Sequence, residues 1–194
     1  MKKFLNTFLI FTFLLLGANF VMAKNIEETK QEILALYSAN HLEEAYELIS
    51  ALTEEERDYE LWYILGNISQ DFNNYTNAIF FLQKSTILNP EFDKAHYNLA
   101  NIYLKEKRYN SAVEEYKVAI KIKKDFPYYW YNLGCAYLGL KEYSKAKAAF
   151  NKAIKLNSLE ADFYYNLALA YKNLNDTKKA QENLDIYNKL VKEK

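Results

Sequence analysis

The fold of this chain is decided by residues 130–153, which read WYNLGCAYLGLKEYSKAKAAFNKA. Large and small apolar side chains recur there three or four positions apart, which is the spacing of one face of an α-helix. Two such faces flank a polar tip at residues 140–142. The pattern predicts two antiparallel helices that pack closely where Gly134 and Ala146 meet. Because one helical hairpin cannot bury such a face alone, we expect the hairpin to repeat.

The same pattern recurs along the chain at a constant interval, the one that separates Leu99 from Leu133. The four registers are Leu65, Gly66 and Ala78; Leu99, Ala100, Tyr103 and Ala112; Leu133, Gly134, Tyr137 and Ala146; and Leu167, Ala168, Tyr171 and Ala180. In this respect residues 59–194 resemble the tetratricopeptide repeat family, whose repeat is a helix–turn–helix of this length. The resemblance implies an all-α, right-handed superhelical solenoid of antiparallel helix pairs. The expected repeats are 59–92, 93–126, 127–160 and 161–194.

Residues 24–58 are a less regular helical pair. Ala45 and Ile49 fit the second helix of a repeat, but the helix before it carries Glu32 near the place of a core leucine. Terminal repeats of a solenoid often drift in this way, because one of their faces meets water. We therefore expect a degenerate first repeat that caps the stack.

The N-terminus has the layout of a secretory signal peptide. A short cationic start, Lys2 and Lys3, precedes an apolar run at residues 4–16, and the small residues that end at Ala23 offer a cleavage site. The alternative is a retained membrane anchor, but the run is short for a bilayer span of about 20 residues. We expect residues 1–23 to be removed and the rest to be exported, in the periplasm or secreted, with no membrane insertion.

The charge balance argues against nucleic acid as a partner. Removal of residues 1–23 leaves 23 basic against 25 acidic residues. Phosphate binding requires a basic excess or a basic stripe. The hydrophobic fraction of 51% is enough for a packed domain.

The sequence contains no recognisable catalytic or metal-binding motif. The two histidines are His41 and His96, and His96 falls in the aromatic core position that Trp130 occupies one repeat later. Zinc needs three or four convergent ligands, so a packed histidine is the favoured interpretation. The single cysteine, Cys135, is read as a small apolar residue within a helix pair. We therefore expect neither enzyme activity nor a cofactor or metal.

Aromatic and amide side chains recur along the first helices of the repeats, which in the tetratricopeptide family line a concave groove. The candidate peptide-binding residues are Tyr63, Asn67, Tyr97, Asn98, Asn101, Tyr131, Asn132, Tyr165 and Asn166. Tyrosine offers a flat apolar ring with a polar tip, and asparagine can donate to and accept from a peptide backbone. The alternative is that these residues only support packing between repeats.

These observations favour a non-catalytic adaptor of the cell envelope that binds an extended protein segment in its concave groove. Two other functions stay open. The chain could be a structural subunit that uses its convex or end surfaces in a permanent complex, or a glycan-binding accessory module whose tyrosines stack on sugar rings. The sequence leaves the oligomeric state open.

The first prediction concerns export. We expect the mature protein to begin at Lys24 and to be released into solution by osmotic shock, because the apolar run is short and ends at a cleavage site. Intact-mass measurement of the native protein checks this. Retention of Met1 in the membrane pellet would contradict it.

Overall fold

The computed structural model describes residues 25–193, and its secondary structure there is helical throughout. The expected all-α solenoid of antiparallel helix pairs is confirmed. The expected signal peptide, residues 1–23, lies outside the described residues. None of the described helices is long and apolar enough to span a bilayer.

The helices follow one another at the period seen in the sequence. Behind a helical segment at residues 25–38 come α2 (Leu42–Ala51), α3 (Tyr59–Asp71), α4 (Tyr75–Leu88), α5 (Asp93–Lys105), α6 (Tyr109–Ile122), α7 (Pro127–Gly139), α8 (Tyr143–Leu156), α9 (Ala161–Asn173) and α10 (Thr177–Lys192). From α3 onward, the first helices of successive pairs begin one repeat period apart, and so do the second helices.

The turn inside each pair has a fixed geometry. Asn73, Lys107, Lys141 and Asn175, again spaced by the repeat period, have positive φ angles of 59–62°. This left-handed conformation lets the chain reverse direction within a short link, and asparagine tolerates it better than most residues. The corresponding residue of the first pair is Asn40, with φ of 63°. The interval from Asn40 to Asn73 is shorter than the repeat period by a single position, so the first pair is slightly out of register.

Charged side chains fix the joint between the first pair and α3. Lys30 contacts the carboxylates of Asp58 at 2.5 Å and Glu60 at 2.7 Å. Burial alone lowers the pKa of Lys30, but these two carboxylates raise it above its ordinary value. Arg57 donates to the carbonyl oxygens of Ile49 and Leu52 at the end of α2. The irregular first pair is thus tied to the first regular repeat.

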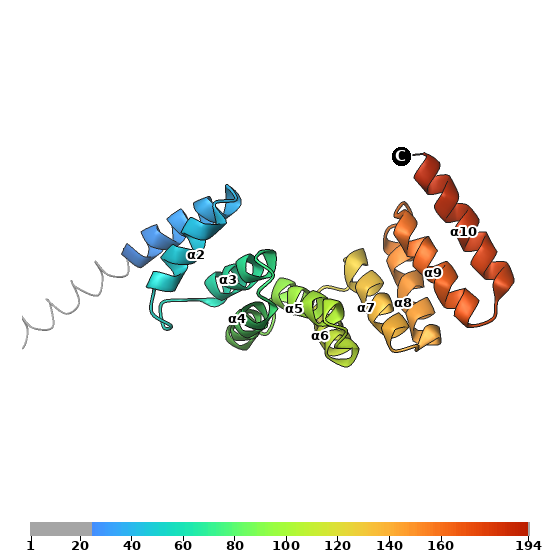
Figure 1. Cartoon of the computed structure of the whole chain (residues 1–194), viewed down its shortest axis with the longest axis horizontal. Helices are drawn as coiled ribbons and strands as arrows, with labels where there is room; N and C mark the ends of the chain where they lie inside the picture. Colours follow the sequence, from blue (N-terminus) through green and yellow to red (C-terminus); the bar gives the residue numbers. More distant parts are fainter. Residues whose placement is uncertain (1–24, 194) are drawn as a thin grey trace, which may run out of the picture.

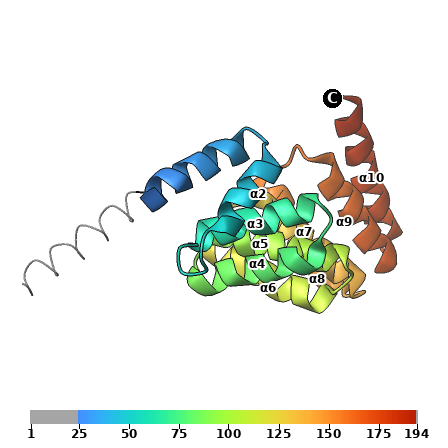
Figure 2. The same cartoon turned by 60° about the vertical axis from the view of Figure 1, so that its left-hand side comes forward.

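The pairs stack along the long axis of the molecule, with residues 25–38 and α2 at one end and α9 and α10 at the other (Figure 1). The view in Figure 2 shows the same succession turned by 60°. Besides the contacts within and between neighbouring pairs, α3 contacts α5, α5 contacts α7, and α7 contacts α9. Helices that meet across a whole repeat lie on the inner side of a curved stack. The first helices therefore form the inner surface.

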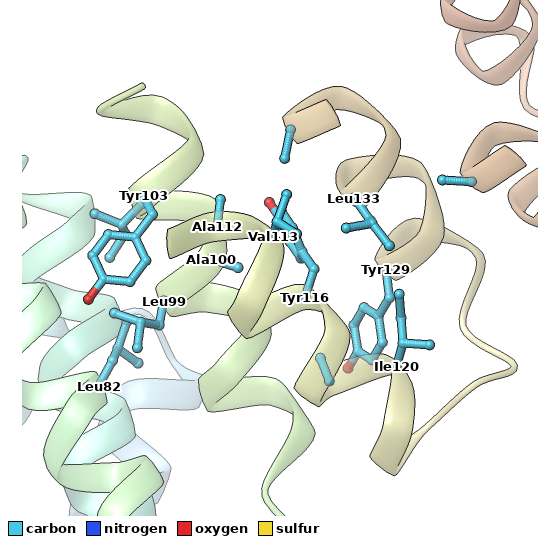
Figure 3. Close-up of a cluster of buried hydrophobic side chains, with 14 of the residues drawn as sticks. Leu82, Leu99, Ala100, Tyr103, Ala112, Val113, Tyr116, Ile120, Tyr129 and Leu133 are labelled. Carbon is cyan, nitrogen blue, oxygen red and sulfur yellow. The ribbon is translucent and has the colours of Figure 1, made fainter. Parts of the chain in front are cut away.

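The core runs through the stack and draws residues from consecutive repeats. In its middle part, Leu82 of α4, Leu99 and Tyr103 of α5, and Tyr116 of α6 pack together (Figure 3). The small residues of the repeat pattern explain how closely the helices approach. A Cβ atom added to Gly134 would lie 2.5 Å from the Phe150 ring. Phe150 is fully buried.

Trp130 is less deeply buried than its place in the repeat pattern suggests. Its indole nitrogen donates to the carbonyl oxygen of Lys124 at 2.9 Å. The ring lines an open cavity of about 280 Å³ beside Ala148 and Ala149. In the first regular repeat, Phe80 and Phe81 fill the same place and pack against Trp62. The small side chains of α8 leave the third repeat open there.

Two substitutions in the same repeat test this difference in burial. We expect Phe150→Ala to lower the free energy of unfolding by about 3–5 kcal/mol, because it opens a closed interior void. Trp130→Ala should cost less, because its ring already borders open space. Chemical denaturation of both variants provides the comparison. An equal or larger loss for Trp130→Ala would contradict the packing described here.

Candidate functional site

The tyrosines of the predicted groove occupy one position on the four inner helices. Tyr63, Tyr97 and Tyr131 are half-buried, whereas the Tyr165 side chain is 50% exposed. Each of the first three packs against aromatic rings at the junction with the next repeat. Tyr97 lies 4.8 Å from Tyr129 between ring centroids, and Tyr131 stacks on Phe163 at the same distance. The tyrosine column is therefore part of the inter-repeat packing.

The asparagines join neighbouring repeats through their side chains. Asn132 of α7 donates its amide to the Tyr97 hydroxyl at 3.0 Å and to the Asn101 side-chain oxygen at 2.9 Å, both in α5. Asn98 makes the same pair of bonds one repeat earlier, to Tyr63 and Asn67. Asn166 donates to the Tyr131 hydroxyl one repeat later. We call this set of tyrosines and asparagines the Tyr–Asn ladder.

The Tyr–Asn ladder changes character toward the C-terminal end. The acceptor position that Asn67 and Asn101 fill is Cys135 in the third repeat and Leu169 in the fourth. Asn166 therefore gives its second bond to a backbone oxygen of its own helix, that of Asp162, at 3.1 Å. Burial raises the pKa of the Cys135 thiol to about 11, so the thiol is protonated at neutral pH. At this one position the inner surface changes from polar in α3 and α5 to apolar in α9.

The ladder also extends in the other direction, to a residue that the sequence pattern did not identify. Asn67 donates to the hydroxyl of Tyr37, in the first helical segment, at 3.1 Å. Burial raises the pKa of Tyr37, as it does that of Tyr97. The repeat pattern missed Tyr37 because, in the alignment of Asn40 with Asn73, Tyr37 matches Gln70 and not the tyrosine position of the later repeats.

The nine candidate residues thus lie together on one surface, but most of their polar groups already have partners in the chain. A ligand backbone would have to compete for the amides of Asn98, Asn132 and Asn166. Their role in peptide binding stays a prediction. On the inner helices, the most exposed aromatic side chains are in the C-terminal half, where Tyr128 is 37% and Tyr165 50% exposed.

His96 is packed, as its repeat position suggested. The ring is buried, with Nδ1 2.7 Å from a Glu115 carboxylate oxygen and Nε2 3.2 Å from the Pro90 carbonyl oxygen. His41 is exposed and contacts Glu44. Among residues 25–193, no group of three potential ligands is placed to hold a metal ion.

Comparison with protein families identifies the repeats. Tetratricopeptide repeat models match residues 59–92, 127–158 and 149–182, and a further model described as a TPR repeat matches residues 100–141. Together they span more than half of the chain. The chain belongs to the tetratricopeptide repeat family. No sequence among the curated proteins matches it significantly.

Solved structures of MamA share this fold. A MamA structure (residues 41 to the end) from Desulfovibrio magneticus RS-1 matches with a TM-score of 0.80 and 22% identity, over 87% of this chain and 96% of that one. MamA from AMB-1 matches with a TM-score of 0.78 and 17% identity, over 87% of this chain and 92% of that one. Similarity at this level of identity supports the fold of the tetratricopeptide chain and nothing further.

A single asparagine tests whether the Tyr–Asn ladder stabilises the stack. Asn132→Ala removes two hydrogen bonds between α7 and α5, each worth about 0.5–1.5 kcal/mol. We expect a loss of about 2 kcal/mol in the free energy of unfolding. Asn151→Ala is the matched control, because that amide bonds only the Lys147 carbonyl oxygen of its own helix. Equal stability of the two variants would show that the ladder carries no net stabilisation.

Proposed function

We propose that this tetratricopeptide chain is a non-catalytic protein-binding scaffold of the cell envelope, which takes an extended segment of a partner protein along its inner surface. The family supports a role in binding proteins. The signal-like N-terminus, residues 1–23, favours the envelope.

The observation that carries the proposal is the row of aromatic side chains held in place on the inner helices. The hydrogen bonds of the Tyr–Asn ladder fix the spacing of successive tyrosines, so a ligand meets a pre-arranged surface. Pre-arrangement reduces the conformational entropy lost on binding. Tyr128 lies at the start of α7. Its ring meets that of Phe163 edge to face, with 5.5 Å between the two ring centroids. Tyr128 is 37% exposed.

The ladder also limits what the groove can recognise. Asn98 and Asn132 direct their amide hydrogens to the neighbouring repeat, so they contribute little sequence-specific hydrogen bonding to a ligand. Recognition then depends on apolar and aromatic contacts with Tyr128, together with the sparse charges of the inner helices. We therefore propose a segment with at least one aromatic or large aliphatic side chain, bound with little dependence on salt.

Peptide selection on the purified protein tests this function. We expect a random peptide library to yield binders rich in aromatic or large aliphatic residues. Tyr128→Ala should weaken these binders by about thirtyfold, the effect of losing an aromatic anchor worth about 2 kcal/mol. Isothermal titration calorimetry with individual peptides measures the change. A library that yields no binder would contradict the proposal.

Phe80→Ala is the matched control. Phe80 is also an exposed aromatic residue, at 51% against 37% for Tyr128, but it lies on α4, outside the inner row of helices. The substitution Phe80→Ala should leave peptide affinity unchanged. Thermal unfolding of both variants separates binding from stability. Peptides that bind Tyr128→Ala as tightly as the unmodified protein, or that lose affinity on Phe80→Ala, would place the site elsewhere.

A further inference from the structure

The end of the stack at α9 and α10 presents an uncovered apolar surface. A pocket of about 150 Å³ opens there, lined by Tyr165, Ala168, Leu169, Lys172, Ala180 and Leu184. Leu169 is 41% exposed and Tyr165 50% exposed. Lys172 is the one charged side chain in this lining. We call this surface the end face. It shares Tyr165 with the predicted groove but does not include Tyr128.

The preceding repeat shows what this kind of surface binds. One repeat period earlier, the matching positions are Tyr131, Gly134, Cys135, Leu138, Ala146 and Phe150. In that repeat α9 covers them: Leu167 and Ala170 pack against Ala146 and Phe150 in one buried cluster. Phe163, at the start of α9, stacks on Tyr131. The first helix of the next repeat is therefore the natural cover of such a face.

The end face also has an unmatched polar group. Tyr63, Tyr97 and Tyr131 each accept a hydrogen bond from an asparagine of the following repeat. No residue among 25–193 supplies that bond to the Tyr165 hydroxyl. An occupant with an asparagine in the place that Asn166 takes in α9 would supply it and extend the Tyr–Asn ladder by one step.

We propose that the end face binds an amphipathic helix of a partner protein in the manner of a fifth repeat. The chemistry of the occupant follows from α9. It carries an aromatic residue, an asparagine three positions later and a leucine directly after that, as Phe163, Asn166 and Leu167 do. An acidic residue facing Lys172 completes the contact. This surface does not depend on the groove proposed above.

A second copy of this chain fits the end face poorly. The leading helix of a second copy would be residues 25–38, aligned through Asn40 and Asn73. In that alignment Glu28 and Glu32 take the places of Leu61 and Leu65, which are buried. Docking would bring two carboxylates onto an apolar surface that offers one lysine, and removing them from water costs free energy. A partner helix with apolar residues there avoids this cost.

The chain's own α9 sequence provides a defined probe. We would titrate a fluorescent peptide of residues 159–175 against the full protein and follow fluorescence anisotropy. Saturable binding is expected, and Leu169→Glu should weaken it at least about tenfold by placing a carboxylate in the pocket. A probe with Phe163→Glu and Leu167→Glu, which imitates Glu28 and Glu32, should not bind.

Ile186→Glu is the matched control, because Ile186 is as exposed as Leu169, at 41%, and lies in α10 outside the pocket lining. It should leave binding of the probe unchanged. Equal binding by Leu169→Glu and Ile186→Glu would overturn the proposal. A lower melting temperature for Leu169→Glu would also overturn it, because it would show that the folded chain already covers this residue.

Sedimentation of the probe-free protein tests the choice of occupant. We expect the sedimentation coefficient to stay constant across concentration, with Leu169→Glu equal to the unmodified chain. Concentration-dependent assembly that Leu169→Glu abolishes would show that a second copy occupies the end face, which contradicts the assignment to a partner helix. Peptide binding in the groove is tested separately, by the affinity of Tyr128→Ala for the selected peptides. The two proposals can therefore fail independently.

Discussion

Each helix pair of this chain leaves an apolar face that only the next pair can cover, and the rest of the structure follows from that requirement. Phe150 is closed off only because α9 packs over it. A fixed period places the same small and large side chains at every junction, so each pair docks with the same geometry. Curvature results from this repetition, since the first helices also contact one another across a repeat.

The Tyr–Asn ladder adds direction to this packing. Apolar contact alone tolerates small sliding between helix pairs, whereas the two bonds of Asn132 require α5 and α7 to be in one register. The ladder thereby removes polar groups from the inner surface that a ligand could have used. Stability of the stack and polar recognition in the groove compete for the same amides. The groove is left with its aromatic surface as the main means of recognition.

The sequence predicted the repeat period and the close contact at Gly134, because both depend on spacing along a helix. It could not assign the asparagines. The period shows that Tyr97 and Tyr131 share a face, but Asn132 bonds to Tyr97 by a diagonal contact that depends on how the pairs stack. The partial exposure of Trp130 was missed for a similar reason. How deeply this tryptophan is buried depends on the residues that face it, which are large at Trp62 (Phe80 and Phe81) but small alanines at Trp130.

The two ends of the stack differ in the residues that they carry at the positions buried inside the stack. At the start of the described chain, Glu28 and Glu32 replace core leucines, so the leading face is compatible with water and resists further stacking. At α9 and α10, Leu169 and Tyr165 keep the apolar character of an interior junction while being exposed. An exposed surface with the same apolar residues as a buried junction can bind a helix that resembles the first helix of a repeat. The asymmetry of the ends therefore gives the stack one direction in which it can be extended by another protein.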